Sequence, residues 1–301
     1  MEKIFIGVDG GGTKTALLVA HADGTEIGAM QTSGASWREH GVRPVAEMIA
    51  GAIASLSESP IGGLVAGLPC FSESVEGDAA LQEAFEDIFP GVPFCLTNDV
   101  EVGWAGSFGL KPGVHLVAGT GSIAYGCDGR GNRVRCGGWD EFFSDEGSAY
   151  WIAQKGMQLF SKQSDGRAPV GPLLMLVREA YKLSRDIDFI DCLYAQMDTR
   201  EKRARFQLLL EKAARLGDTA AAAIYADAAA ELCLMARTVR EKLGLDTEGW
   251  RVSYSGGVFK AGDLILEPLA KQIRDEGGLL IAPEHLPVKG ALLLALDRFV
   301  Q

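Results

Sequence analysis

The chain has 301 residues and is 47% hydrophobic, which is enough for large cores and for roughly two domains. It carries 29 basic and 40 acidic residues, which give a formal charge of −11. This acidic balance lacks the basic footprint of a nucleic-acid binder and repels anionic substrates at long range. Any phosphate that the protein binds must therefore be held by local hydrogen-bond donors and a metal ion.

The sequence also argues against a membrane or secreted protein. No apolar run approaches the roughly 20 uncharged residues of a membrane-spanning helix, and the first residues lack the core of a signal peptide. The six cysteines contain no CxxC pair and are best explained as reduced thiols. We expect a soluble, cytoplasmic protein with no nucleic-acid or membrane partner.

The chain opens with two apolar strands around a glycine-rich turn. Residues 4–8 and 16–19 are the predicted strands, and the turn 9–14 between them reads DGGGTK. Further strands at 64–66 and 94–96 alternate with helices. This alternation indicates a largely parallel sheet with helices on its faces.

The opening pattern occurs a second time. Residues 114–118 form an apolar run, the turn 119–122 reads GTGS, and residues 123–126 form the return strand. Two copies about 110 residues apart predict a duplicated domain, although any β-hairpin gives a similar pattern.

The rest of the chain defines the expected domain limits. Beyond Glu146 the pattern is largely helical, and a last α/β unit contains Ser255, Gly256 and Gly257. We expect one domain over residues 1–110 and a second over 111–286 with a helical insertion. The domains would share a hinge near residues 98–112, and the C-terminal helix, about 287–301, could pack back on the first domain.

The turn 9–14 has the residue types of a phosphate site. Its glycines let backbone N–H groups approach phosphate oxygens, Thr13 and Lys14 add a hydroxyl and a cation, and Asp9 could hold hydrated magnesium. A tight hairpin turn would need the same glycines, so one loop decides little. The second turn strengthens the phosphate interpretation, because two such turns could grip two ends of one triphosphate.

Two other acidic positions are candidates for chemistry. Asp99 follows a strand, and a carboxylate at the carboxyl end of a parallel strand lies where α/β sheets bind ligands, which suits a general base. Capping of the next helix by Thr97, Asn98 or Asp99 is the simpler explanation of this pattern alone. The segment 136–151 combines carboxylates and aromatic residues that suit a sugar, with Ser144 or Asp145 as a helix cap being the alternative.

Taken in order, these segments resemble the BadF/BadG/BcrA/BcrD ATPase family, especially its eukaryotic-type N-acetylglucosamine kinases. Residues 7–15 (GVDGGGTKT) are similar to the family's first phosphate motif, and residues 117–122 (VAGTGS) to its second. Residues 255–258 (SGGV) resemble its adenosine motif, and residues 287–291 (PVKGA) its closing signature. The most specific stretch combines CGGW at 136–139 with DEGSAYWI at 145–152.

The resemblance implies an α/β fold of duplicated ribonuclease H-like domains, as in actin-like ATPases, around a nucleotide and sugar cleft. It implies an ATP-dependent kinase that uses Mg²⁺, phosphorylates an amino sugar such as N-acetylglucosamine or glucosamine, and forms a homodimer. Asp99 is the implied catalytic base, and Asp9 and Asp99 are the implied metal ligands. The implied ATP-binding residues are Gly11, Gly12, Thr13, Lys14, Gly119, Thr120, Gly121, Gly256 and Gly257. The implied sugar-binding residues are Ser36, Trp37, Asp99, Thr120, Cys136, Gly138 and Asp145.

The chain departs from the family on the sugar side. The family's kinases carry an asparagine five residues before a glycine, and counting back from Gly41 puts Ser36 there, beside Trp37. The family's GWG and GDEGS are replaced by Trp139-Asp140 and by a serine before Asp145. The kinase chemistry is therefore better supported than the identity of the sugar.

Two other functions stay open. Some relatives resemble ATPases that activate 2-hydroxyacyl-CoA dehydratases or benzoyl-CoA reductases through an iron–sulfur cluster, which needs cysteine thiolates at a dimer interface. Only Cys127 and Cys136 lie near the right region, and Cys136 belongs to the kinase motif. The second alternative is a non-catalytic sugar sensor, which the presence of both Asp9 and Asp99 disfavours.

Overall fold

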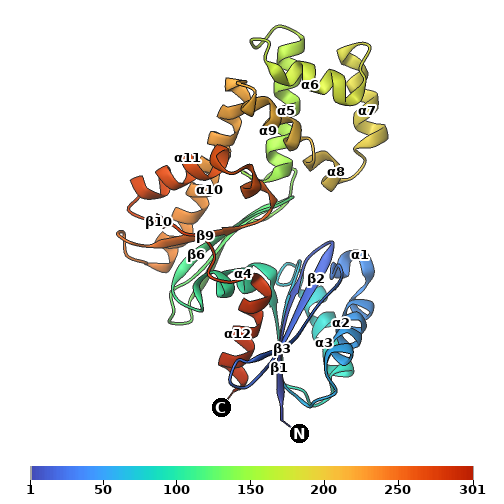
Figure 1. Cartoon of the computed structure of the whole chain (residues 1–301), viewed down its shortest axis with the longest axis vertical. Helices are drawn as coiled ribbons and strands as arrows, with labels where there is room; N and C mark the ends of the chain where they lie inside the picture. Colours follow the sequence, from blue (N-terminus) through green and yellow to red (C-terminus); the bar gives the residue numbers. More distant parts are fainter. Residues whose placement is uncertain (1, 301) are drawn as a thin grey trace. The chain divides into compact units, whose positions relative to one another are not determined.

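The computed structural model describes residues 2–300, which divide into two compact units (Figure 1). Unit 1 comprises residues 2–113, 129–131 and 282–300, and unit 2 comprises residues 114–128 and 132–281. The sequence predicts the corresponding divisions at 110/111 and 286/287. The last segment of the chain thus belongs to the same unit as the first.

A five-stranded mixed sheet forms the centre of unit 1. In the order β3-β2-β1-β4-β5, β1 pairs antiparallel with β2 and parallel with β4, which pairs parallel with β5. The strands are β1 Ile4–Gly10, β2 Lys14–His21, β3 Glu26–Ser33, β4 Ile61–Leu68 and β5 Phe94–Asn98. Buried apolar runs in β1 and β4 fit central strands covered on both faces. The parallel strands β1, β4 and β5 end at one edge of this sheet.

Helices cover both faces of the sheet in unit 1. Ile49 of α2 and Phe85 of α3 are buried in one core with alternate residues of the strands, such as Ile6. Phe5 and Leu18 point to the opposite face, where they pack against α12. The helices of this unit are α1 Trp37–His40, α2 Val42–Leu56, α3 Val75–Ile88, α4 Asp99–Phe108 and α12 Pro287–Phe299.

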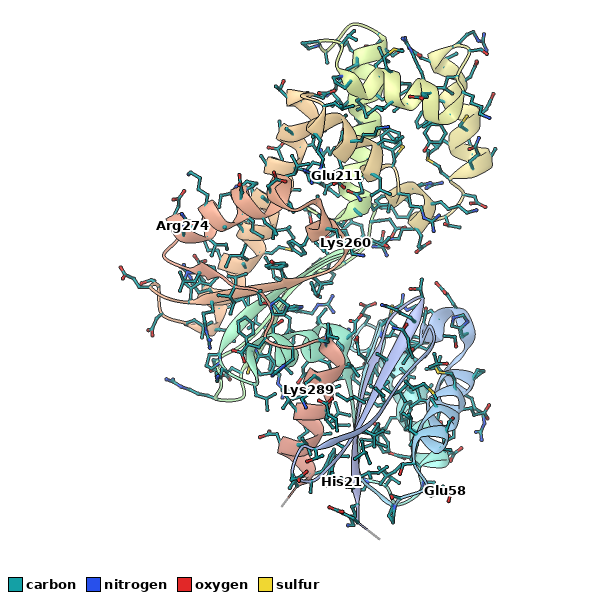
Figure 2. The ribbon with its side chains drawn as sticks, viewed as in Figure 1. His21, Glu58, Glu211, Lys260, Arg274 and Lys289 are labelled. Atoms are coloured by element: carbon teal, nitrogen blue, oxygen red, sulfur yellow. The ribbon has the colours of Figure 1, made fainter. Side chains whose placement is uncertain are left out.

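The C-terminal helix α12 is an integral part of unit 1. It packs against α4, β1 and β4, and its Leu292 is fully buried beside Phe5 and Leu18. Pro287 occupies the first turn, where the missing N–H costs nothing. Lys289 Nζ donates to Glu26 Oε1 at 2.6 Å, which ties α12 to β3 (Lys289 is labelled in Figure 2).

The sheet of unit 2 has the same strand order as that of unit 1. Its order is β10-β9-β6-β7-β8, with β6 parallel to β9, β9 parallel to β10, and β7 antiparallel to β8. The strands are β6 Gly113–Ala118, β7 Ser122–Cys127, β8 Arg133–Gly137, β9 Arg251–Ser255 and β10 Leu279–Leu280. Substituting β6–β10 for β1–β5 reproduces the first sheet. The expected duplication into ribonuclease H-like units of the actin-like ATPase fold is confirmed.

A helical insertion separates β8 from β9 in unit 2. Its helices are α5 Ala149–Ser164, α6 Pro172–Tyr181, α7 Phe189–Gln196, α8 Arg200–Ala204, α9 Gln207–Arg215 and α10 Thr219–Leu243, with a 3₁₀ turn η1 at Asp186–Asp188. A second 3₁₀ turn, η2 at Gly257–Ala261, and α11 at Asp263–Asp275 follow β9. Figure 1 shows α5 to α9 gathered away from the sheet of this unit.

Helix α10 alone in residues 2–300 is long and apolar enough to cross a membrane, with a mean hydropathy of 1.3 over its best window. However, Tyr225, Leu232 and Ala236 of this helix are fully buried in the core of unit 2. The helix also packs against α11, α9 and β7. These contacts are those of a core helix in a globular domain.

Candidate active site

The first glycine-rich turn joins β1 to β2 in unit 1. Gly11 N donates to Lys14 O at 2.9 Å, and Ala35 N donates to Gly11 O at 2.9 Å, so the segment after β3 braces the turn. Gly12, Thr13 and Lys14 are exposed. The turn therefore presents the Thr13 hydroxyl and the Lys14 ammonium at the edge where the parallel strands end. The backbone N–H groups beside them are accessible because glycine has no side chain.

Asp9 and Asp99 belong to the same edge of this sheet. Asp9 pairs with Gly67 of β4, Gly67 pairs with Thr97 of β5, and Asp99 follows two residues later at the start of α4. Burial raises the pKa of Asp99 to about 7, with a further rise from the charge of Asp9. Burial also raises the pKa of Asp9 to about 6, against the opposing charge of Lys14.

The carboxyl of Asp99 is not the cap of helix α4. Asn98 is the N-cap, because its Oδ1 accepts from Val100 N at 3.1 Å while its Nδ2 donates to Phe71 O at 2.7 Å. Thr97 Oγ1 donates to the carboxylate of Glu101. Helix capping, the simpler explanation of this sequence pattern, is therefore the role of Asn98. The Asp99 carboxyl remains a candidate for chemistry.

The sugar-side candidates of unit 1 lie where α1 begins. Ser36 is the N-cap residue, 9% exposed, and its side chain makes no capping hydrogen bond. The Trp37 ring packs directly over Gly77 of α3, where a Cβ would clash with it. The Arg38 guanidinium lies 5.4 Å from the centre of the Trp37 ring and donates to Glu73 at 3.5 Å. Helix α3 thus supports the Trp37 ring, and Glu73 and the Trp37 ring together hold Arg38.

The second glycine-rich turn joins β6 to β7 in unit 2. Gly119 N donates to Gly121 O at 2.9 Å and closes the turn. At the start of α5, Ala149 N donates to Gly119 O at 2.8 Å and Tyr150 N donates to Thr120 O at 3.3 Å. The N-terminus of α5 thus holds this turn in place. Like the turn of unit 1, it follows the first strand of its sheet.

The acidic loop before α5 approaches this second turn. Asp145 Oδ1 accepts from Ser122 N at 3.3 Å, and the side chain of Arg200 donates to Oδ2. Burial raises the pKa of Asp145, while Arg200 opposes the rise. The alternative explanation of Ser144 or Asp145 as a helix cap is wrong: Ser148 caps α5, accepting from Trp151 N at 3.1 Å.

The other predicted residues of unit 2 surround the same edge. Cys136 pairs with Ala124 across the β7–β8 hairpin, and Gly138 follows β8 with a φ of +67°. Gly256 has a φ of +111° and lies against the backbone of Ala118, so that a side chain there would clash. Gly257 begins η2 directly after it. The adenosine-type turn therefore abuts the strand that leads into the second phosphate-type turn.

The structure thus gathers the predicted residues into two sets, one in each unit. Asp9, Gly11–Lys14, Ser36, Trp37 and Asp99 form the set of unit 1. Gly119–Gly121, Cys136, Gly138, Asp145 and Gly256–Gly257 form the set of unit 2. Sequence reasoning missed Arg200, the partner of Asp145, because it lies 55 residues away in the helical insertion and belongs to no motif.

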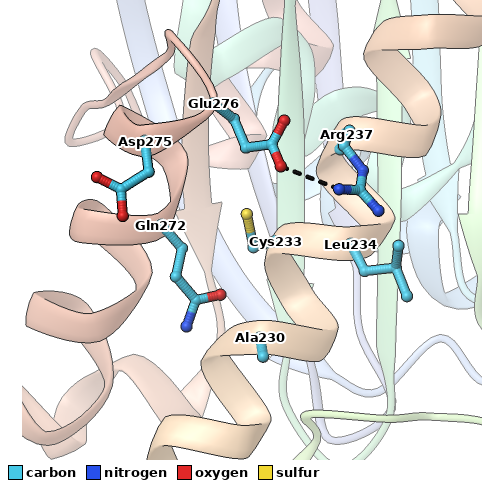
Figure 3. A pocket seen from close by; sticks show the side chains of 7 residues that line it. All are labelled: Ala230, Cys233, Leu234, Arg237, Gln272, Asp275 and Glu276. Carbon is cyan, nitrogen blue, oxygen red and sulfur yellow. Dashed lines mark hydrogen bonds and ion pairs between the residues drawn. The ribbon is translucent and has the colours of Figure 1, made fainter.

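An open groove between α10 and α11 in unit 2 contains none of these residues (Figure 3). Its volume is about 320 Å³, and Arg237 is paired across it with Glu276 at 2.9 Å. Burial raises the pKa of Cys233 in this groove to about 11, so the thiol stays protonated and unreactive near neutral pH. The lining residues are Ala230, Cys233, Leu234, Arg237, Gln272, Asp275 and Glu276.

Two sheets of the same strand order, each with a glycine-rich turn after its first strand, are characteristic of the actin-like ATPase fold. The model of the BadF/BadG/BcrA/BcrD ATPase family matches residues 6–295, and the chain belongs to that family.

Three known proteins similar to this chain are named as sugar kinases. The N-acetyl-D-glucosamine kinase of Dictyostelium discoideum is 28% identical over 318 residues, with 98% of each chain covered. The N-acetylmuramic acid/N-acetylglucosamine kinase of Clostridium acetobutylicum is 27% identical over 263 residues, covering 85% of this chain and 86% of that one. A solved structure from Chromobacterium violaceum, provisionally named N-acetylglucosamine kinase, has a TM-score of 0.78 and 26% identity, covering 97% of this chain and 99% of that one.

Proposed function

We propose that this protein is an ATP-dependent sugar kinase that transfers the γ-phosphate to a hydroxyl of an amino sugar such as N-acetylglucosamine or glucosamine. The observation that carries the proposal is the acidic edge of unit 1, where Asp99 has a raised pKa beside Asp9 and the first glycine-rich turn. Family membership and full-length similarity to two sugar kinases support it.

Asp99 is the proposed catalytic base. A group whose pKa lies near the working pH both accepts and releases a proton efficiently, and burial raises the pKa of Asp99 to about 7. Its carboxylate would accept the proton of the attacking sugar hydroxyl. Phosphoryl transfer depends mostly on positioning and charge neutralisation, so one base is enough.

Magnesium is the proposed cofactor, with Asp9 and Asp99 as its carboxylate ligands. Two carboxylates near one sheet edge suit a hard cation, which prefers oxygen ligands and retained water. When bound, the ion would neutralise charge on the phosphates. Lys14, which lowers the pKa of Asp9, supplies a further positive charge at that turn.

Glycine-rich backbone would bind ATP in this protein. The two turns after β1 and β6 would hold the phosphates, and the turn after β9 would accept the adenosine. The residues proposed for ATP are Gly11, Gly12, Thr13, Lys14, Gly119, Thr120, Gly121, Gly256 and Gly257. The residues proposed for the sugar are Ser36, Trp37, Asp99, Thr120, Cys136, Gly138 and Asp145.

We also propose a cytoplasmic homodimer without nucleic-acid or membrane partners. The formal charge of −11 disfavours binding to nucleic acid or anionic lipid, and α10 is buried in the core of unit 2. The alternative of an iron–sulfur activator is disfavoured by the two cysteines nearest the expected cluster region. Cys127 of β7 is only 4% exposed, and Cys136 of β8 pairs with Ala124, three residues before Cys127. Two such thiols do not form an exposed pair for a cluster between subunits.

A panel of sugars tests the proposal directly. Purified protein with ATP and Mg²⁺ is assayed for ADP release with N-acetylglucosamine, glucosamine, glucose and N-acetylmuramic acid. We expect rapid, sugar-dependent ADP release with at least one amino sugar, with mass spectrometry showing a sugar phosphate. ADP release that is independent of every sugar, together with an iron content and absorbance near 400 nm, would favour the activator instead.

A further inference from the structure

The buried carboxylate of Asp145 has a partner outside the motifs. Arg200 Nη2 donates to Asp145 Oδ2, and Arg200 Nε lies 3.4 Å from Glu141 Oε2. The Asp145 side chain is 4% exposed and that of Arg200 is 33% exposed. One guanidinium therefore links the buried acid to the loop that precedes it, entirely within unit 2.

The helical insertion holds Arg200 in place. Arg200 is the first residue of α8, which packs against α5, and Ala204 of α8 is buried. Arg203 Nε donates to Met197 O at 2.9 Å and fixes the loop before α8. Because the first turn of α5 is bonded to the turn 119–121, the insertion connects Arg200 firmly to that turn.

The backbone of Asp145 is in the left-handed region, with a φ of +61° that is uncommon outside glycine. Ser122 N fixes one carboxylate oxygen and Arg200 the other. A carboxylate has about four acceptor positions, and these two contacts occupy two of them. The two contacts orient the group without saturating it.

The guanidinium also covers the second glycine-rich turn. A Cβ at Gly121 would lie 2.6 Å from Arg200 Nη2, so the absence of a side chain at Gly121 is what admits the arginine. Arg200 is thus built into the same small region as the turn and the acid.

We propose that Arg200 is a positioning residue of the sugar site, which orients the Asp145 carboxylate and thereby sets the affinity for the sugar. The inference rests on the proposed kinase function, with Asp145 as a sugar ligand. The helical insertion then has a definite role, since it delivers the arginine to the site.

Arg200 also affects the ionisation of Asp145. Burial raises the pKa of Asp145, as do the neighbouring carboxylates of Glu141 and Asp140. Arg200 and the Ser122 N–H lower it. Without Arg200 a smaller fraction of the carboxyl is ionised at a given pH, and an ionised acceptor makes the stronger hydrogen bond to a hydroxyl.

The variants Arg200→Gln and Arg200→Lys test this role, with Lys202→Gln as the matched control. Lys202 lies on the same helix and pairs with exposed Asp198 at 2.6 Å, away from Asp145. A hydrogen bond to a charged group corresponds to roughly a tenfold to hundredfold change in an equilibrium constant. We expect Arg200→Gln to raise the sugar KM by that factor with the ATP KM unchanged, Arg200→Lys to recover part of the loss, and Lys202→Gln to match wild type.

Two further readouts separate positioning from a purely structural effect. In the Asp145→Asn background, Arg200→Gln is expected to add little, because both variants remove one interaction. In Arg200→Gln alone, the pH below which the sugar KM rises should move upward. Thermal unfolding shows whether each variant is folded. If Arg200→Gln does not fold, Arg200→Lys, which keeps the positive charge, provides the test.

Three results would overturn the role of Arg200. These are an unchanged sugar KM, a change confined to the ATP KM, or effects of Asp145→Asn and Arg200→Gln that multiply. Failure of the proposed function is a different result, in which the wild type phosphorylates no sugar at all. An active wild type with an equally active Arg200→Gln variant removes only the inference about Arg200.

Discussion

His115 links the stability of unit 2 to the turn proposed for adenosine. Its side chain is 1% exposed on β6, and Nε2 lies 2.9 Å from the Oγ of Ser255, the residue before Gly256. Burial lowers the pKa of His115 from 6.5 to about 3. The imidazole therefore stays neutral in the folded protein at pH values where an exposed histidine is charged.

The sign of the pH effect follows from proton binding. Between about pH 6.5 and 3 the unfolded chain binds a proton at His115 that the folded chain does not, so the free energy of unfolding falls as the pH falls through this window. At 1.36 kcal/mol for each pKa unit, the loss between pH 7.5 and 4.5 is about 3 kcal/mol.

The variant His115→Gln tests this magnitude, because the amide reaches Ser255 from a similar position and does not titrate. Free energies of unfolding are measured by urea titration at pH 7.5 and 4.5 for wild type and variant. We expect the variant to be the less stable at pH 7.5 because it packs worse. At pH 4.5 the difference should shift in its favour by about 3 kcal/mol.

Ser255→Ala is the control for His115→Gln. It removes the hydrogen-bond partner and keeps the imidazole, so it should retain the pH dependence of wild type. Parallel pH dependences for wild type and His115→Gln would refute the reasoning, since they would mean that burial does not keep His115 neutral.

Three further outcomes test the site and the fold. Asp99→Asn should lower sugar phosphorylation by about 10²–10⁴-fold while calorimetry still detects ATP binding, and near-normal turnover would contradict its role as base. Chelation of Mg²⁺ should stop transfer, and Asp9→Asn should raise the Mg²⁺ concentration for half-maximal rate; an unchanged Mg²⁺ dependence would remove Asp9 from the metal site. Leu292→Ala, at a fully buried position of α12, should lower the free energy of unfolding by about 2–5 kcal/mol, whereas an unchanged melting temperature would contradict the packing of α12.

The duplicated fold could be predicted from the sequence because glycine-rich turns and apolar strands are local signals. Both turns follow the first strand of a sheet, and the strand orders of the two units correspond. The role of Asp99 could not be decided in this way, because Asn98 and Asp99 are equally good caps in a sequence pattern. Only the hydrogen bond from Val100 N to Asn98 shows which of them is the cap.

The cap of α5 and the partner of Asp145 could not be predicted from local sequence patterns. Ser144 and Asp145 both have the residue type of a cap, but α5 begins after Ser148, whose side chain accepts from Trp151 N. Arg200 becomes its partner through the packing of α8 on α5. Such a contact depends on tertiary structure, and no spacing in the sequence encodes it.

Ser36 is one of the positions at which we expect this chain to depart from the family's kinases, and Ser36→Asn breaks no capping hydrogen bond of the native structure. The Ser36 hydroxyl makes no capping bond to α1, and asparagine is among the best N-cap residues, so the helix should keep its stability. Arg38 is engaged by Glu73 and by the Trp37 ring, which keeps the neighbouring surface unchanged.

The expected effect of Ser36→Asn is on substrate range. An asparagine side chain can accept from and donate to a sugar at once, whereas the serine is shorter and carries a single hydroxyl. A site built to hydrogen-bond a particular group rejects analogues strongly, and a site without that bond discriminates weakly. We therefore expect wild type to show a relaxed preference, or one shifted to a bulkier or anionic sugar, and Ser36→Asn to sharpen selection of N-acetylglucosamine.

The measurement is kcat/KM for N-acetylglucosamine, glucosamine, glucose and N-acetylmuramic acid in wild type, Ser36→Asn and Ser36→Ala. Ser36→Ala separates loss of the hydroxyl from gain of the amide, because it creates space without a new hydrogen bond. If a water molecule already takes the place of the amide, wild type will favour N-acetylglucosamine by orders of magnitude and Ser36→Asn will not sharpen that preference. That result would show that Ser36 does not set the specificity.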